Sequence, residues 1–120
     1  YIYIMKMRLN TIYFDYIKNK VKLYEIRVYD AKRREIKLLE ILDFEDKDSN
    51  RKIKARIVEL SYFKNFKEAI EQVGIKDVLP NAKSLKDGIE IYNNFPYREG
   101  CCYKDAAKNY GVLRMKFELL

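Results

Sequence analysis

Alternation of hydrophobic and polar side chains predicts the strands of this chain. Residues 52–62 alternate hydrophobic positions, from Ile53 to Ile57, with basic ones. Residues 112–119 alternate most regularly, with a hydrophobic series that begins at Leu113 and a mostly polar series opposite it. Successive side chains of a strand point to opposite faces, so each pattern predicts a strand. Weaker alternation predicts three more strands, over residues 3–9, 23–29 and 38–44.

Hydrophobic residues at helical spacing, each series preceded by a capping residue, predict the helices. Asn65 stands before one such series and Ser84 before another. Both side chains are of the type that accepts a hydrogen bond from the first turn of a helix. Asn10 is predicted to cap a short helix after the first strand in the same way, and Gly74 to end the helix that follows Asn65. A last short helix is predicted over residues 103–110.

The order of these elements predicts an α+β fold. It reads β-α-β-β-β-α-α-α-β, and the helices do not alternate regularly with the strands, which disfavours a doubly wound parallel sheet. Short strands with helices inserted between them instead predict a small, mostly antiparallel β-barrel with helices at its rim. No internal repeat or linker divides residues 1–120, so a single domain is expected.

The composition removes several kinds of chemistry. The chain of 120 residues contains no His, which excludes Ser-His-Asp and Cys-His catalysis and His metal ligands. Its two Cys are neighbours, Cys101 and Cys102, and two thiolates are too few for a tetrahedral zinc site. We expect reduced thiols, no cofactor and no metal, and hence an intracellular protein of the cytoplasm or nucleus. No segment approaches the roughly 20 apolar residues of a membrane span, so no membrane partner is expected.

The formal net charge of +7 is unevenly distributed. Residues 18–34 hold seven basic and two acidic side chains, and residues 51–67 hold six and one. Between them, residues 35–50 hold six acidic and two basic side chains. The basic blocks have two explanations, a phosphate-binding face or solvated lysines of a Lys-rich chain. Asp43, Glu45, Asp46 and Asp48 form an acidic turn that is dense enough for a weak metal site, but a solvated turn is favoured.

The segment between the first predicted helix and the next strand carries a motif. Lys22, Glu25 and Arg27 follow the order K-x-x-E-x-R. Together with the strand that ends at Phe44 and the closing strand after Gly111, this motif resembles the ASCH domain family, named for homology to the activating signal cointegrator. The resemblance spans nearly the whole chain.

Two glycines of the family pattern are replaced in this sequence. Lys20 stands where a Gly is usual before the motif, and Leu39 stands where a Gly is usual before a later strand. Glycine at such turns usually supplies a positive φ. We therefore expect rearranged turns, with Asn19 rather than Lys20 in the left-handed conformation, because Asn adopts it more readily than Lys. Neither replacement removes a charged group from the expected site.

The resemblance implies a PUA-like β-barrel that binds RNA or a nucleotide in a cleft between the barrel and the first helix. Lys22, Glu25 and Arg27 would line this cleft. Lys and Arg hold phosphates or base edges, and Glu25 can orient Arg27 or accept a hydrogen bond from a base amino group. Further residues expected to help, through basic or stacking side chains, are Lys20, Tyr24, Lys32, Arg33, Arg34, Tyr97 and Tyr103.

Three alternatives stay open at this point. Without the resemblance, the charged motif is an ordinary ion-pair cluster on an exposed strand. Some family members are described as nucleases or as amidohydrolases acting on acetylated cytidine, which would make Lys22 and Glu25 catalytic residues of a small hydrolase. The amidohydrolase branch has a threonine where Glu25 stands, and Glu25 is expected to keep Lys22 protonated, which disfavours catalysis. A protein-interaction adaptor would instead use the basic blocks to bind an acidic partner.

Overall fold

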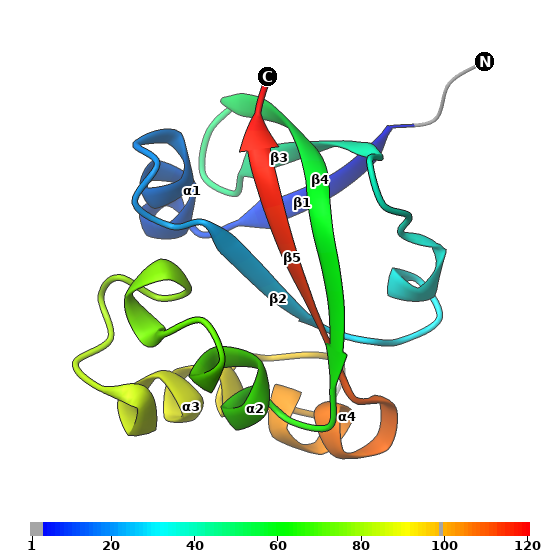
Figure 1. Cartoon of the computed structure of the whole chain (residues 1–120), viewed down its shortest axis with the longest axis vertical. Coiled ribbons are helices and arrows are strands. Elements are labelled where there is room, and N and C mark those ends of the chain that lie inside the picture. The colour runs from blue at the N-terminus through cyan, green and yellow to red at the C-terminus, as the bar shows by residue number, and fades with distance from the viewer. Residues whose placement is uncertain (1–3, 99) are drawn as a thin grey trace.

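The computed structural model of the chain describes residues 4–98 and 100–120, in the element order expected from the sequence (Figure 1). The strands are β1 (Met5–Leu9), β2 (Tyr24–Val28), β3 (Ile41–Asp46), β4 (Lys52–Phe63) and β5 (Val112–Leu119). The helices are α1 (Thr11–Lys18), α2 (Phe66–Glu71), α3 (Leu85–Asn93) and α4 (Tyr103–Tyr110), with short 3-10 turns η1 (Arg33–Glu35) and η2 (Ile75–Asp77). Within the described ranges, no helix is both long and apolar enough to cross a membrane.

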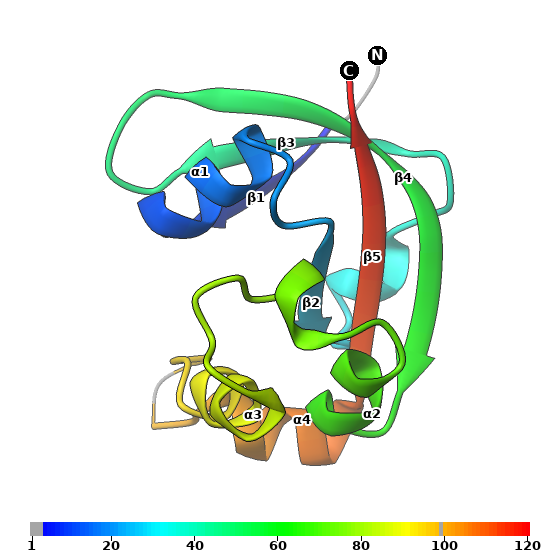
Figure 2. The ribbon, with the colours of Figure 1, turned by 60° about the vertical axis from the view of Figure 1, so that its left-hand side comes forward.

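The five strands form one curled sheet in the order β1-β3-β4-β5-β2. Only the β1–β3 pair is parallel, so the predicted mostly antiparallel α+β fold is confirmed. A register shift between Ile57 and Glu59 interrupts the pairing of β4 with β5. The sheet is a half-barrel, because β1 and β2 stand at its two edges, with α2, α3 and α4 gathered at one end (Figure 2).

Two hydrophobic cores meet along this sheet. The first fills the curl of the sheet beneath α1 and includes Phe14, Ile17 and Phe44. The second packs α2, α3 and α4 against β2 and β5, and includes Ile26 and Tyr92. Burial of each such side chain contributes about 1.5–3 kcal/mol, so each core holds its helices against the sheet.

Two of the three predicted helix caps are confirmed. The Asn65 side chain accepts a hydrogen bond from the Glu68 amide at 2.9 Å, and the Ser84 hydroxyl accepts one from the Asp87 amide at 3.1 Å. The expectation for Asn10 is wrong, because it stands before α1 but its side chain makes no capping hydrogen bond.

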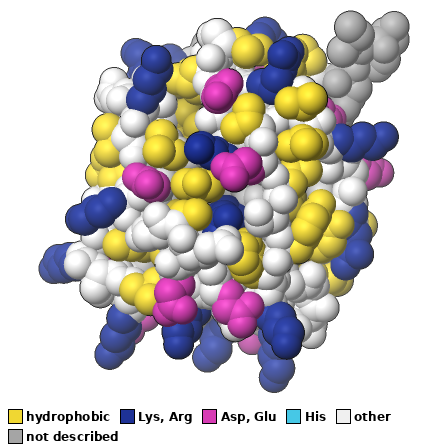
Figure 3. Space-filling view, in the orientation of Figure 1, with side chains coloured by type: hydrophobic (Ala, Val, Ile, Leu, Met, Phe, Trp, Pro, Cys, Tyr) yellow, Lys and Arg dark blue, Asp and Glu magenta, His cyan; other side chains and the backbone are white. Residues whose placement is uncertain are grey.

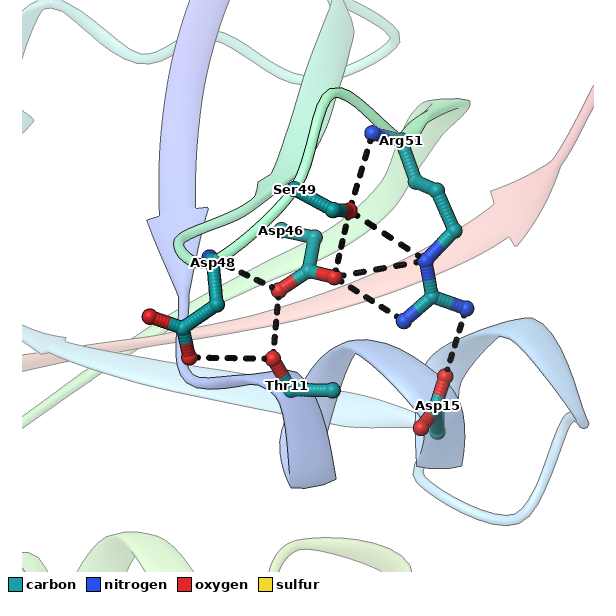
Figure 4. A network of polar contacts seen from close by, with 6 residues as sticks. All are labelled: Thr11, Asp15, Asp46, Asp48, Ser49 and Arg51. Atoms are coloured by element: carbon teal, nitrogen blue, oxygen red, sulfur yellow. Dashed lines mark hydrogen bonds and ion pairs between the residues drawn. The ribbon is translucent and has the colours of Figure 1, made fainter.

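A network of polar contacts ties the start of α1 to the β3–β4 turn instead (Figure 4). The Thr11 hydroxyl donates to Asp46 at 2.6 Å, and Arg51 bridges Asp46 and Asp15 at 2.9 and 3.0 Å. The hydrogen bonds from Thr11 and then Ser49 hold the pKa of Asp46 well below its usual value. The acidic turn thus anchors α1, which forms one side of the cleft described below.

The pattern of the sequence misplaced one strand boundary and one buried side chain. Residues 38–44 were expected to form a strand, but β3 begins at Ile41, and Leu38 and Leu39 are exposed in the turn before it. Arg114, expected on the polar side of the last strand, is buried under α2 and donates to the Ala69 carbonyl at 2.8 Å. Residues 112–115 of β5 are buried on both faces, whereas Glu118 is exposed, so alternation alone could not show where the polar side of the strand is solvated.

The two positions at which the resemblance implies a glycine have a backbone conformation that favours glycine. Lys20 has φ 61° and Leu39 has φ 70°, and both lie in the left-handed region. The expectation that Asn19 takes this conformation is wrong, since its φ is −88°. A non-glycine residue in this region carries backbone strain of about 1–2 kcal/mol.

We therefore predict that Lys20→Gly and Leu39→Gly each raise the free energy of unfolding by about 0.5–1 kcal/mol, the strain relieved less the extra entropy of glycine in the unfolded chain. Urea unfolding measures the change. Asn19→Gly is the matched control, because its φ needs no glycine, and we expect it to be neutral or destabilising. A loss of stability in both test variants would contradict this account of the turns.

Candidate functional site

A cleft of about 200 Å³ lies where the edge strands β1 and β2 face the helical end of the molecule. Its lining residues come from β1, α1, β2, α3 and α4 and from loops between elements. Figure 2 shows how these elements are arranged, with α1 above β2 and with α3 and α4 below it. The lining of the cleft combines three kinds of side chain. The basic and acidic ones are Arg8, Lys22, Glu25, Arg27 and Lys47, the aromatic ones are Tyr13, Tyr92, Phe95 and Tyr103, and the remainder are Leu9, Asn10, Ile26, Leu79 and Pro96.

The three residues of the K-x-x-E-x-R motif meet in this cleft. Glu25 lies between the two cations, with its carboxylate 3.5 Å from Lys22 Nζ and 3.3 Å from Arg27 Nη2. The amide of Ile26 donates a further hydrogen bond to Glu25 Oε1 at 2.9 Å. Lys22 is 1% exposed and Glu25 is 5% exposed, so this is a buried ion pair and not a solvated cluster on an exposed strand.

The same side chains connect the parts of the fold around the cleft. Arg27 Nη2 donates to the carbonyl of Arg8 at 3.1 Å, which joins the edge strands β1 and β2 across the open side of the half-barrel. Lys22 Nζ donates to the carbonyl of Val78, which joins the start of β2 to the helical end. The motif therefore fixes the shape of the cleft as well as its charge.

Burial and charge act in opposite directions on the pKa values of these groups. Burial alone would raise the pKa of Glu25, but the charges of Lys22 and Arg27 outweigh it, so the pKa falls below the ordinary value. Burial lowers the pKa of Lys22, and the charge of Glu25 only partly offsets this. Glu25 does pair with Lys22 as expected, yet it does not prevent a lowered Lys22 pKa.

An aromatic cluster forms the helical wall of the cleft. The ring of Tyr92 stacks on Phe66 at 4.9 Å between centroids, and Tyr103 stacks on Phe66 at 5.9 Å. Phe95 meets the edges of Tyr92 and Tyr103 at 5.5 and 6.0 Å. Burial raises the pKa of Tyr92 well above its usual value, so its hydroxyl stays a neutral hydrogen-bond donor.

Two buried polar atoms on the cleft-lining side chains have no hydrogen-bond partner within residues 4–98 and 100–120. They are the Tyr92 hydroxyl and Arg27 Nε. Buried donors are almost always paired, because an unpaired one costs about 1–3 kcal/mol. Tyr92 and Arg27 therefore line the cleft with hydrogen-bonding capacity that no described residue uses.

Tyr97 and Arg33 lie beside the cleft without lining it. The Tyr97 ring is 5.9 Å from the ring of Tyr103, and its hydroxyl donates to Asp30 at 2.5 Å. The backbone amide of Arg33 donates to the same Asp30 carboxylate at 3.1 Å.

The other expected binding residues lie outside the cleft. Tyr24 packs under Arg114 on the other side of β2, at 5.2 Å from the guanidinium carbon to the ring centroid. Lys20 is exposed and borders a separate hollow beside β5, and Arg34 is exposed and lies over the ring of Tyr29. Lys32 is exposed in the loop before η1.

Several cleft residues carried no clear signal in the sequence. Tyr92 occupies a hydrophobic-face position of α3, and at 1% exposed it is also part of the core, so its spacing alone indicated packing. Tyr13 lines the cleft from α1, and Arg8 and Lys47 reach it from β1 and the acidic turn. These segments meet only through tertiary contacts, which no local pattern reveals.

The surface does not gather its basic side chains into one patch on the face of Figure 3. Charged side chains of both signs lie near the centre among hydrophobic ones, and Lys and Arg project around the margin. The acidic residues of β3 are neutralised across the β3–β4 pair, since Asp43 pairs with Lys54 at 3.0 Å and Glu45 with Lys52 at 3.5 Å. Within the described ranges, no three metal-ligating side chains come together.

No protein-family model matches the chain, and no curated protein matches it. Solved structures do match. The crystal structure of hypothetical protein PH0355 is 34% identical, with a TM-score of 0.82 over 98% of this chain and 100% of that one. The solution structure of protein PF0455 from Pyrococcus furiosus is 32% identical, with a TM-score of 0.74 over 98% of each chain.

This chain belongs to the same family as PH0355 and PF0455. The half-barrel is therefore the fold of this family, at nearly the full length of its members. PH0355 is described as hypothetical, so the relationship establishes the fold and carries no activity with it.

We predict that Glu25→Gln lowers the free energy of unfolding by about 3 kcal/mol, because it leaves the buried charges of Lys22 and Arg27 without a counter-ion. Urea unfolding followed by circular dichroism measures the loss. Glu59→Gln is the matched control, since its pair with Lys116 at 3.6 Å is solvent-exposed and its loss costs less than about 1 kcal/mol. Equally small losses of unfolding free energy in the two variants would contradict the claim that the buried charges of Lys22 and Arg27 depend on Glu25.

Proposed function

We propose that this protein is an RNA- or nucleotide-binding domain of the ASCH type, and that its cleft receives one unpaired base. The observation that carries the proposal is the pair of unpartnered buried donors, Tyr92 hydroxyl and Arg27 Nε, on the walls of a cleft that also holds a carboxylate. Proteins that read unpaired bases use such hydrogen bonds to the base edge together with aromatic rings.

The size and lining of the cleft favour a small planar ligand. Its volume of about 200 Å³ is below the ~300–1,000 Å³ of sites for drug-sized ligands, which suits a single base better than a longer ligand. Tyr13, Phe95 and Tyr103 supply aromatic surface for stacking. Glu25 keeps its negative charge because its pKa is lowered, and it can accept from a base amino group.

The turns support the ASCH assignment independently of the cleft. The chain departs from the family pattern by lacking two glycines, yet Lys20 and Leu39 keep positive φ at both positions. At both positions the backbone therefore has the left-handed conformation that a glycine of the family pattern would adopt, although the residue is not glycine. A half-barrel open between β1 and β2, with the motif at its mouth, is also compatible with the PUA-like architecture that the resemblance implies.

A small hydrolase that acts on a modified nucleoside or on RNA is the second candidate function. The observation in its favour is the lowered pKa of Lys22, a property that a nucleophilic or basic lysine requires. Against it, Lys22 Nζ is already engaged by Glu25 and by the carbonyl of Val78. Binding therefore explains the geometry with fewer changes than catalysis.

We predict that Tyr92→Phe weakens binding of single-stranded RNA about fivefold, the loss of one hydrogen bond, without lowering the free energy of unfolding. Stability is unaffected because this hydroxyl has no partner in the unliganded protein as far as residues 4–98 and 100–120 show. Fluorescence anisotropy with a short RNA of mixed sequence measures affinity, and binding is expected to weaken as salt rises.

Tyr62→Phe is the control for this experiment, because Tyr62 is exposed on β4 away from the cleft lining. Equal affinities of wild type, Tyr92→Phe and Tyr62→Phe would rule out the base-binding cleft. Incubation with acetylcytidine and with RNA, with and without divalent metal, shows whether the protein hydrolyses either substrate or only binds it. Turnover that Lys22→Ala abolishes would establish catalysis.

A further inference from the structure

A second arginine with an unpartnered guanidinium group lies behind the cleft. Arg33 follows β2 in the turn η1, and its Nη1 atom is buried without a hydrogen-bond partner in the described part of the chain. Arg27 Nε is unpartnered in the same way. Of the three such buried side-chain atoms in the described ranges, two thus belong to arginines of adjoining segments.

The position of Arg33 is fixed through Asp30. The Asp30 carboxylate accepts the backbone amide of Arg33 at 3.1 Å and the hydroxyl of Tyr97 at 2.5 Å, and Arg98 lies 3.8 Å away. Tyr97 in turn packs 5.9 Å from Tyr103, which lines the cleft. Asp30 therefore holds Arg33 at the Tyr103 side of the cleft while its own oxygens are occupied by other donors.

The cations at this place outnumber the carboxylates, since Lys22, Arg27, Arg33 and Arg98 share Glu25 and Asp30. Glu25 is the single carboxylate between Lys22 and Arg27, and it makes no hydrogen bond or ion pair to Arg33. Burial, and after it the positive charge of Arg27, lowers the pKa of Arg33, although Tyr103, Asp30 and Glu25 act in the opposite direction. An unpartnered N–H of a buried cationic group is costly, and an anion that accepts from it removes this cost.

We propose that Arg27 and Arg33 form a phosphate-binding subsite beside the base-binding cleft. A guanidinium group presents N–H donors in a planar fork that matches the oxygens of a phosphate. A phosphate there satisfies both unpartnered arginine donors and neutralises the excess charge. The assignment of this phosphate to a nucleotide rests on the proposed function, whereas the anion site itself does not.

The test uses inorganic phosphate as the probe, followed by NMR titration of the full chain. We expect Arg33→Gln to weaken phosphate binding about tenfold through the loss of charge-assisted hydrogen bonds. Arg34→Gln is the matched control, because Arg34 is the neighbouring arginine and lies over the exposed side of Tyr29. We expect it to change phosphate affinity less than twofold, and Arg33→Lys to restore part of the loss.

A second arm compares cytidine with cytidine 5′-monophosphate. We expect the monophosphate to bind more tightly, and this advantage to disappear in Arg33→Gln but not in Arg34→Gln. The inference is overturned if wild type binds no phosphate saturably, or if Arg33→Gln binds it as wild type does. Arg33-dependent phosphate binding without any binding of cytidine or RNA would support the anion subsite while the proposed function fails.

Discussion

The buried carboxylate of Glu25, held between Lys22 and Arg27, is the interaction on which the rest of the structure depends. Removing charges from water costs several kcal/mol for each ion, and a buried ion pair seldom repays more than that cost. Here the charged side chains also hold separate parts of the fold together by hydrogen bonds. Through Arg27 it reaches β1, and through Lys22 it reaches the helical end, so one charge cluster connects three parts of the fold.

This arrangement explains why a half-barrel can keep a cleft at its mouth. The edge strands β1 and β2 are not hydrogen-bonded to each other. Hydrophobic side chains packed between these strands would fill the space that the cleft occupies. A charged cluster holds the edges by a side-chain hydrogen bond, and its residues Lys22, Glu25 and Arg27 line the cleft.

Much of the fold was readable from the sequence, because alternation and capping are local signals. The β4 pattern and the Asn65 and Ser84 caps were correct, and the motif residues meet as expected. Arg114 was misplaced because burial of both faces of β5 depends on α2, which lies far away in the sequence. Tyr92 shares a helix face with core residues, so only the tertiary structure shows that it also lines the cleft.

The most direct test of the central claim, that the cleft of Lys22, Glu25 and Arg27 receives the ligand, is the NMR signal of the Arg27 Nε–H group. This donor is buried and has no partner in the ranges that the structure describes, so a ligand that pairs with it changes its environment directly. The account predicts that single-stranded RNA shifts this signal saturably, together with signals of Tyr92 and Tyr103. An unchanged Arg27 signal at saturating RNA, with shifts confined to the exposed side of β4, would contradict it.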